Sequence, residues 1–515
     1  MNPAVVLRPA TAALVLLLGL SACGDPDSRS AAEGSEPVPE VDGSGEADEA
    51  DVGPEVQPGV EPETDPPEQE QEQEPPALEE SPPPPPRFTR PDSIRGIYLT
   101  AWSAGSAARS EALIDLAGET ELNTFVIDIK DASGFVSHRT GVEMARDLGA
   151  DGEIRIGDLP GLLRRLKEAD IYPVARIVVF KDHLLPETRP DLALRETGAV
   201  TAAGEDPGPA GPAEDADGNH DDELPEAFWR DGGGHPWSSP RSREVWDYHV
   251  ELAREVAEMG FPEIQWDYVR FPDVPGSVQE ALVIPGTEEG PRAQVIRRFL
   301  AHTREELSDL DVRVTADVFG VAATARTDVG IGQRWEDFID VVDAALPMIY
   351  PSHYWEGSFG LDSPNAYPYE VIWESLGQAT VRSAAVEGAG EVIPWLQDFS
   401  LGSPRYEAPE VRAQIQATYD RGIPHWVLWN PGSRYTRDAL APAEGFPEGH
   451  DPLIRLGGRI MPASQRLATP LGDGAEPPPT LLEEAGVDGW RPPWDRALLS
   501  QTLPPRWRIT PDPGR

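Results

Sequence analysis

The sequence predicts an α/β protein built on a (β/α)8 TIM barrel, and three observations carry this prediction. Short apolar runs rich in Val, Ile, Tyr and Trp alternate with amphipathic helical stretches between residues 93 and 430. Eight such runs can be counted, which is the number of strands in that barrel. No run is followed by a Gly-x-Gly-x-x-Gly turn, so a doubly wound, nucleotide-binding sheet is disfavoured.

The expected strands and helices alternate along the chain. Strands are expected at 94–101, 124–130, 172–180, 263–271, 313–320, 343–350, 391–399 and 425–430. Helices are expected between them, for example at 158–169, 242–259, 292–307, 334–341, 368–378 and 408–421, where apolar residues follow a helical period. The barrel domain should therefore cover residues 91–440.

The regions around the barrel differ from it in composition. Residues 24–90 are nearly all Pro, Glu, Asp, Gly, Ser and Gln, with 20 acidic and 3 basic side chains, and are expected to form a disordered linker. Residues 441–515 are Pro- and Gly-rich and are expected to form an irregular extension. Two apolar segments of this extension, 453–460 and 489–494, could dock on the barrel.

An acidic insertion, 196–236, interrupts the regular pattern and is expected to be a surface loop. Within it, Asp215, Asp217 and Asn219 alternate around a glycine, as oxygen ligands do at the start of an EF-hand-type calcium loop. No glutamate stands at the closing position, and no helical pattern flanks the segment. A solvated loop is therefore favoured over a calcium site.

The first 23 residues have the features of a bacterial signal peptide. Arg8 supplies the positive start, and residues 11–20 form an apolar run too short to span a bilayer. The segment Leu20-Ser21-Ala22-Cys23 resembles the lipobox of bacterial lipoproteins, and Cys23 is the single cysteine of the chain. We therefore expect lipidation at Cys23 and an extracytoplasmic protein anchored at the cell membrane or cell surface. A chance cysteine in an ordinary secretory signal is the alternative.

The net charge of −47 bears on the possible partners. Such acidity argues against nucleic acid or anionic lipid as a ligand. Among the nine histidines there is no His-x-His pair, and no Gly-x-Ser-x-Gly elbow occurs. Neither a metal site, nor another cofactor, nor a Ser-His-Asp hydrolase is therefore predicted.

Two aspartates are the candidate catalytic residues. In a TIM barrel the functional side chains gather at the carboxyl ends of the strands. Asp267 and Asp317 occupy matching positions near the ends of the fourth and fifth expected strands, which are neighbours. Two carboxyl groups across a sugar are what glycosidic cleavage requires, one ionised and one protonated. The alternative is that either aspartate caps the next loop or pairs with an arginine such as Arg270.

Other polar and aromatic side chains near the strand ends are candidates for substrate binding. Asp128 and Lys130 should point to one side of the second strand and could form an ion pair that hydrogen-bonds sugar hydroxyls at the mouth of the barrel. A structural salt bridge is the equal alternative. Aromatic faces and amides suit sugar rings and hydroxyls. On these grounds the further candidates are Trp266, Arg270, Tyr350, His353, Gln397, Asp398 and Trp429.

Several of these segments resemble a known family over residues 93 to 435. They are RGIYLT (95–100), VIDIKD (126–131), QWDYVRFP (265–272), ADVFG (316–320), PMIYPSHY (347–354) and PWLQDF (394–399). The family is a group of TIM-barrel glycoside hydrolases first catalogued as a domain of unknown function. The resemblance implies the same barrel and a polysaccharide substrate.

The arrangement of the aspartates also resembles that of α-amylase-like hydrolases. In those enzymes an aspartate that ends strand four is the nucleophile, and a glutamate that ends strand five is the general acid/base. Transferred to this chain, the resemblance implies that Asp267 is the nucleophile and Asp317 the acid/base. An aspartate in place of the glutamate departs from that pattern and shortens the reach by one methylene.

The sequence thus favours an extracytoplasmic glycoside hydrolase that acts on a polysaccharide through Asp267 and Asp317. The alternative is a non-catalytic surface lipoprotein that binds carbohydrate through Tyr350, Gln397 and Trp429. Both hypotheses include a membrane attachment through the lipid, and neither includes nucleic acid.

Overall fold

The computed structural model describes residues 84–196 and 228–468. The predictions for Cys23, the signal peptide, most of the linker, residues 215–219 and residues 489–494 lie outside the described residues. Within the two described ranges, no helix combines the length and the apolarity needed to cross a bilayer.

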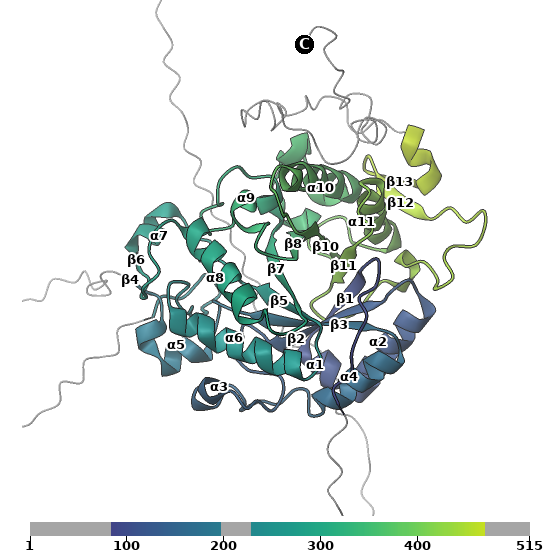
Figure 1. Cartoon of the computed structure of the whole chain (residues 1–515). Helices are drawn as coiled ribbons and strands as arrows, with labels where there is room; N and C mark the ends of the chain where they lie inside the picture. The colour runs from purple at the N-terminus through teal and green to yellow at the C-terminus, as the bar shows by residue number, and fades with distance from the viewer. Residues whose placement is uncertain (1–83, 197–227, 469–515) are drawn as a thin grey trace, which may run out of the picture. The chain divides into compact units, whose positions relative to one another are not determined.

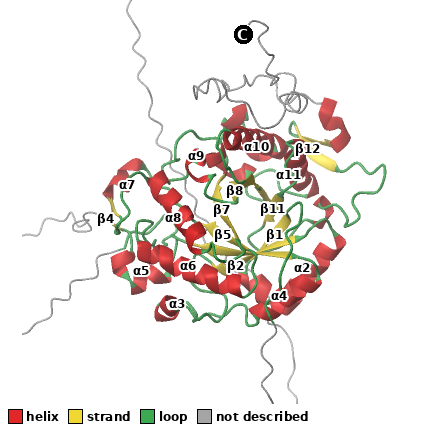
Figure 2. Cartoon of the chain, viewed as in Figure 1, coloured by secondary structure: helices red, strands yellow, loops and turns green. Residues whose placement is uncertain are grey.

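Eight parallel strands close into a barrel, which confirms the predicted fold class (Figures 1 and 2). They are β1 (Arg95–Leu99), β2 (Thr124–Lys130), β3 (Tyr172–Val178), β5 (Glu263–Asp267), β7 (Arg313–Phe319), β8 (Ala344–Ile349), β10 (Trp395–Gln397) and β11 (Trp426–Trp429). The ring closes because β1 pairs with both β2 and β11, while β10 pairs with both β11 and β8. A two-residue strand, β9 (Glu391–Val392), extends the pairing of β8.

Helices surround the strands, as Figure 2 shows by colour. They are α1 (Ala101–Gly105), α2 (Ala107–Glu119), α3 (Glu143–Asp147), α4 (Leu159–Glu168), α5 (Leu184–Thr188), α6 (Arg243–Glu258), α7 (Gly276–Ala281), α8 (Arg292–Glu306), α9 (Trp335–Phe338), α10 (Pro368–Ala384) and α11 (Ala408–Asp420). Local signals set their starts. The carboxylate of Asp158 accepts a hydrogen bond from the Gly161 N–H at 2.8 Å, and Glu407 and Glu410 form a capping box at the start of α11.

Alternation along the strands divides the buried side chains into two groups. One group lies inside the barrel and includes Tyr98, Val174 and Trp395. The other lies between the strands and the helices and includes Ile127 and Phe299. Whether a strand residue points inward or toward the helices therefore depends on its parity, that is, on whether it is an even or odd number of positions from a residue known to point inward. Only inward residues near the carboxyl ends can reach the mouth.

Charged side chains close the amino end of the barrel. Glu263, only 3% exposed, accepts a hydrogen bond from the Tyr172 hydroxyl at 3.2 Å and lies 3.7 Å from Nε of Arg313. Glu391 forms ion pairs with Arg313 at 2.9 Å and with Arg90 at 2.5 Å. We call these five residues the base cluster. Because Arg90 belongs to it, the folded part of the chain begins before residue 91.

The first part of the carboxyl-terminal extension is regular rather than irregular. Strands β12 (Leu453–Leu456) and β13 (Arg459–Pro462) form an antiparallel hairpin. Ile454 and Leu456 are buried, and Arg455 forms a 2.6 Å ion pair with Glu410 of α11. Near the acidic insertion, β4 (Arg195–Glu196) pairs with β6 (Leu282–Val283).

Gly320, the glycine after Asp317, is required by close packing. A Cβ at this position would lie 2.4 Å from the carbonyl oxygen of Met348 in β8. We expect Gly320→Ala to lower the free energy of unfolding by about 1–3 kcal/mol, because the two chain segments must separate. Urea denaturation measures this effect.

Gly118 in α2 is the matched control. No atom lies within 4 Å of a Cβ built there, so Gly118→Ala should raise stability by about 0.5–1 kcal/mol through helix propensity alone. Equal effects of the two substitutions would contradict the packing argument.

Candidate active site

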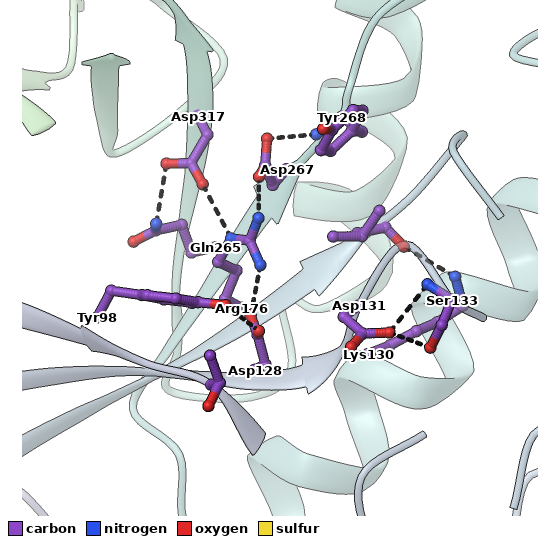
Figure 3. Close-up of polar contacts among 12 residues, drawn as sticks. Tyr98, Asp128, Lys130, Asp131, Ser133, Arg176, Gln265, Asp267, Tyr268 and Asp317 are labelled. Carbon is purple, nitrogen blue, oxygen red and sulfur yellow. Dashed lines mark hydrogen bonds and ion pairs between the residues drawn. The ribbon is translucent and has the colours of Figure 1, made fainter. Parts of the chain in front are cut away.

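Arg176 lies at the centre of the candidate site, near the carboxyl end of β3 (Figure 3). Its Nη1 forms an ion pair with Asp128 and its Nη2 with Asp267, and its Nε lies 3.7 Å from Oδ2 of Asp317. All three aspartates are at least 96% buried. The structure therefore brings together the two predicted catalytic aspartates and Asp128 around one guanidinium.

Strand register explains this convergence. Asp128 of β2 is aligned with Arg176 of β3, which is aligned with Gln265 of β5. Asp267 and Asp317 lie two residues beyond Gln265 and its β7 partner, Thr315. Their side chains therefore also point into the barrel, one layer closer to its carboxyl end. The barrel thus delivers charged groups from four neighbouring strands to one place.

Asp317 is the most enclosed of the three carboxyl groups, with 1% of its surface exposed. Its Oδ1 accepts hydrogen bonds from Trp395 Nε1 at 2.6 Å and from Gln265 Nε2 at 2.9 Å. Burial raises the pKa of Asp317 well above its usual range, and the nearby charge of Asp267 raises it further, while Arg176 and the two hydrogen bonds oppose this shift. A carboxyl group in this environment retains a proton and can donate it.

Asp267 contacts donors on both of its oxygens. Oδ2 contacts Arg176, and Oδ1 accepts a hydrogen bond from the backbone N–H of Tyr268 at 2.5 Å. Tyr268 has a φ of 50°, in the left-handed region that residues with a Cβ rarely adopt. Such a conformation costs on the order of 1 kcal/mol.

Asp128 contacts the hydroxyl of Tyr98 as well as Arg176. Burial raises the pKa of Asp128 to about 6, although Arg176 opposes the shift. One guanidinium cannot neutralise three carboxylates, so protons are retained within the group near neutral pH. The site can therefore present an ionised and a protonated carboxyl group together.

An aromatic wall lies beside these carboxyl groups. Trp429 stacks between Tyr98, at 6.1 Å, and Tyr350, at 5.6 Å, with interplanar angles of 28° and 29°. Phe399 meets Trp429 edge-on, and the His353 ring contacts both Tyr350 and Phe399. Burial lowers the pKa of His353 to about 4, so its imidazole is neutral at pH 7. Three predicted residues, Tyr350, His353 and Trp429, thus lie together.

The expected Asp128–Lys130 ion pair does not form. The β2–β3 register shifts between these two residues, which removes their common direction. The fully buried Lys130 pairs with Asp182 at 2.7 Å and donates to the Val178 carbonyl at 3.0 Å. The prediction that Lys130 binds substrate through this pair is therefore wrong.

Trp266 also does not reach the mouth. It lies between the inward residues Gln265 and Asp267, so strand alternation turns it toward the helices. Its ring is fully buried and packs 5.5 Å from that of Phe299 in α8. Its assignment to substrate binding is therefore a misjudgement of strand parity.

Gln397 and Asp398 are engaged within the protein. Gln397 accepts a hydrogen bond from the Ser352 N–H at 3.1 Å and donates to the Phe399 carbonyl at 2.9 Å. Asp398 accepts from the Thr436 N–H at 2.8 Å and from the Thr436 hydroxyl at 2.6 Å. These contacts join the loops after β8, β10 and β11 and leave Gln397 fully buried. Both residues support the mouth instead of presenting free polar groups.

Sequence reasoning did not select four residues of this site: Tyr98, Arg176, Gln265 and Trp395. The signal for Arg176 was available, because it is the single charged residue in the run from Tyr172 to Val178. A charge inside an apolar strand needs a partner or a function. The residue alternates with Val174 on the inner face, which is the parity of Asp128 and Asp267.

Comparison with known proteins gives one family match. A family model described as "putative glycosyl hydrolase domain" matches residues 96–435, which confirms the resemblance predicted from the motifs. No curated protein matches the chain significantly.

Solved structures also resemble this chain. A hypothetical protein from Ruminiclostridium thermocellum shares 30% identity, covering 43% of this chain and 97% of that one, with a TM-score of 0.34. The PgaB glycoside hydrolase domain from Bordetella bronchiseptica shares 13% identity over 68% of this chain and 99% of that one, with a TM-score of 0.43. An α-galactosidase from Thermus thermophilus shares 15% sequence identity, covering 68% of this chain and 60% of that one, with a TM-score of 0.36.

The buried carboxyl group of Asp398 makes a prediction about stability. Burial raises the pKa of Asp398 from 3.8 to about 6, so the folded state holds its proton more tightly than the unfolded state does. This contribution to stability is complete below pH 4 and is lost as the pH rises through 6. We expect the free energy of unfolding of the wild type, minus that of Asp398→Asn, to fall by about 2 kcal/mol between pH 4 and pH 7.

Thr436→Val provides the control for this measurement, which uses urea denaturation at each pH. The substitution removes a hydroxyl that stabilises the ionised carboxylate, so the decline should extend to higher pH. A difference between wild type and Asp398→Asn that does not change with pH would refute this account of Asp398.

Proposed function

The chain belongs to the glycosyl hydrolase family matched over residues 96–435, and on this premise we propose that it hydrolyses O-glycosidic bonds of a polysaccharide through Asp267 and Asp317. One observation carries the proposal. Both carboxyl groups meet Arg176 at the carboxyl ends of neighbouring strands, in environments that differ in the way an acid and a nucleophile require.

The two aspartates have different roles in this proposal. Asp317 retains its proton because it is enclosed, and it gives that proton to the glycosidic oxygen as the bond to the anomeric carbon breaks. Asp267 accepts hydrogen bonds from Arg176 and from the Tyr268 N–H, which suits a carboxylate that attacks or stabilises the anomeric carbon. Water then releases the sugar and restores the proton to Asp317.

Arg176 is a positioning residue in this scheme. Its planar guanidinium binds Asp128 through one nitrogen and Asp267 through another, and its positive charge partly compensates the negative charge of the buried carboxyl groups. The aromatic wall of Tyr98, Tyr350 and Trp429 lines one side of the site with apolar rings, and its least buried member, Trp429, is the one that the C–H groups of a sugar would contact.

The place of action is part of the same proposal. The apolar run before Cys23 and the single cysteine support export and lipid attachment, so the barrel would work outside the cytoplasm on a linker of acidic and Pro-rich composition. Globomycin sensitivity of processing, together with a mass shift lost in Cys23→Ser, measures this directly.

The first test is the release of reducing ends from a panel of bacterial exopolysaccharides and α-glucans. Asp267→Asn and Asp317→Asn should each lower turnover by about a thousandfold or more, because each removes one of the two reacting carboxyl groups. Circular dichroism and thermal unfolding verify that both variants fold.

Glu263→Gln is the matched control. It neutralises another buried carboxyl group on the same strand as Asp267, but at the amino end of the barrel. Turnover in this variant should stay within a few-fold of wild type. Glycan binding without turnover, unaffected by either aspartate substitution, would replace the enzyme proposal by a carbohydrate-binding lipoprotein.

The pH dependence tests the role of Asp317. Trp395→Phe removes a hydrogen bond that stabilises the ionised carboxylate, so the pKa of Asp317 should rise further. The basic limb of kcat/KM, where the acid loses its proton, should then move to higher pH by about one unit. Trp426→Phe is the control, since the Trp426 N–H donates to Tyr419 instead of a carboxyl group. An unshifted limb in Trp395→Phe would exclude Asp317 as the acid.

A further inference from the structure

Next to Asp267 lies a group of cationic and aromatic side chains that the proposed mechanism does not use. The Arg270 guanidinium carbon lies 4.9 Å from the ring centres of Tyr268 and Trp237 and 4.5 Å from that of Phe319. The Lys181 ammonium lies 5.3 Å from the Tyr268 ring. We call these five residues the cationic layer.

The two cations of the layer differ in their partners. Lys181 has a carboxylate counterion, Asp231, at 2.9 Å. Arg270 has no carboxylate within 4 Å among the residues that the structure describes, and the single hydrogen bond found for its side chain runs from Nη1 to the Phe271 carbonyl at 3.1 Å. Only 8% of Arg270 is exposed.

A buried guanidinium without a counterion is costly. Aromatic faces attract the charge, but they do not satisfy the N–H donors. Burial accordingly lowers the pKa of Arg270, although Asp273, Asp267 and Asp231 act in the opposite direction from a distance. What this position lacks is an acceptor with negative charge, and a guanidinium suits one with two oxygens.

The cationic layer is connected to both reacting carboxyl groups. Tyr268 donates its N–H to Asp267 and places its ring against Arg270. Phe319, which also contacts Arg270, stands two residues after Asp317 in β7. A sugar held at the two aspartates would therefore lie close to Arg270.

We propose that Arg270 binds an anionic group, a carboxylate or a phosphate, carried by a sugar unit next to the bond that is cleaved. The proposal rests on the proposed function, because it assigns the substrate class of the same site. The net charge of −47 does not oppose it, since charges beyond about 8 Å are screened at physiological salt. Of the nearer carboxylates, Asp231 is paired with Lys181 and Asp267 with Arg176.

Equilibrium binding tests this inference independently of turnover. The full-length Asp317→Asn variant, which keeps the contacts of Arg270, would be titrated calorimetrically with oligomers of galacturonate, guluronate and mannuronate and with the same oligomers after carboxyl reduction. A second arm uses phosphorylated oligosaccharides and their dephosphorylated forms. At least one charged ligand should bind about tenfold or more tightly than its neutral counterpart, as expected for a charge-assisted hydrogen bond.

Substitutions then assign the preference to Arg270. Arg270→Gln should reduce it to within about twofold, and Arg270→Lys should retain part of it, because the charge remains without the planar fork. Arg421→Gln is the matched control. Arg421 also stacks on an aromatic ring, 3.7 Å from Trp373, and also donates to a backbone carbonyl, but it follows α11 outside the barrel mouth.

The outcomes separate the two proposals. Equal binding of charged and neutral ligands in both arms, or a preference that persists in Arg270→Gln, overturns the role of Arg270. An Arg270-dependent preference without hydrolysis of any glycan supports the anion site and removes the enzyme. Hydrolysis of neutral glycans without such a preference supports the enzyme and removes the anion site. The arm that shows the preference identifies carboxylate or phosphate.

Discussion

The ion pairs of Arg176 are the interactions on which the mouth of the barrel depends. Three carboxyl groups are buried there, and removing a carboxylate from water is costly unless a counterion compensates. One guanidinium serves all three, so the carboxyl groups compete for it and their protonation is linked. The different environments of Asp267 and Asp317 follow from this shortage of positive charge and from their different hydrogen-bond donors.

The fold and the positions of the two aspartates could be predicted because both follow from regular patterns in the sequence: strands alternate with helices along the chain, and side chains alternate between the two faces of each strand. Strands of a parallel barrel are buried on both faces, so they appear as apolar runs, and neighbouring strands end at the same rim. Asp267 and Asp317 therefore had to lie near each other. Arg176 obeys the same parity rule, but it stands before the end of its run and was not considered among the residues of the mouth.

The wrong predictions have two physical causes. The β2–β3 register shifts after Asp128, and Lys130 pairs with Asp182, which lies 52 residues further along the chain, so no local pattern reveals either feature. The assignment of Trp266 followed residue type alone, although its position between two inward residues already placed it on the helical side. The aromatic wall was easier to anticipate, because Tyr350 and Trp429 both stand at strand ends, where inward side chains meet at the mouth.

The base cluster lies at the opposite end of the barrel from the mouth, so in related proteins the two ends can change in sequence separately. Strands β5 and β7 each carry a residue of that cluster at their start, Glu263 and Arg313, and a carboxyl group of the mouth at their end. Between the ends of β5 and β7, Gln265 hydrogen-bonds to Asp317 of the mouth and Thr315 hydrogen-bonds to Glu263 of the base cluster. Apolar interior side chains of other strands, such as Val174 and Leu346, also lie between the two ends. Mutations at the rim can therefore alter substrate choice while the ion pairs that secure the fold stay intact. Selection can act on the two ends of one strand separately.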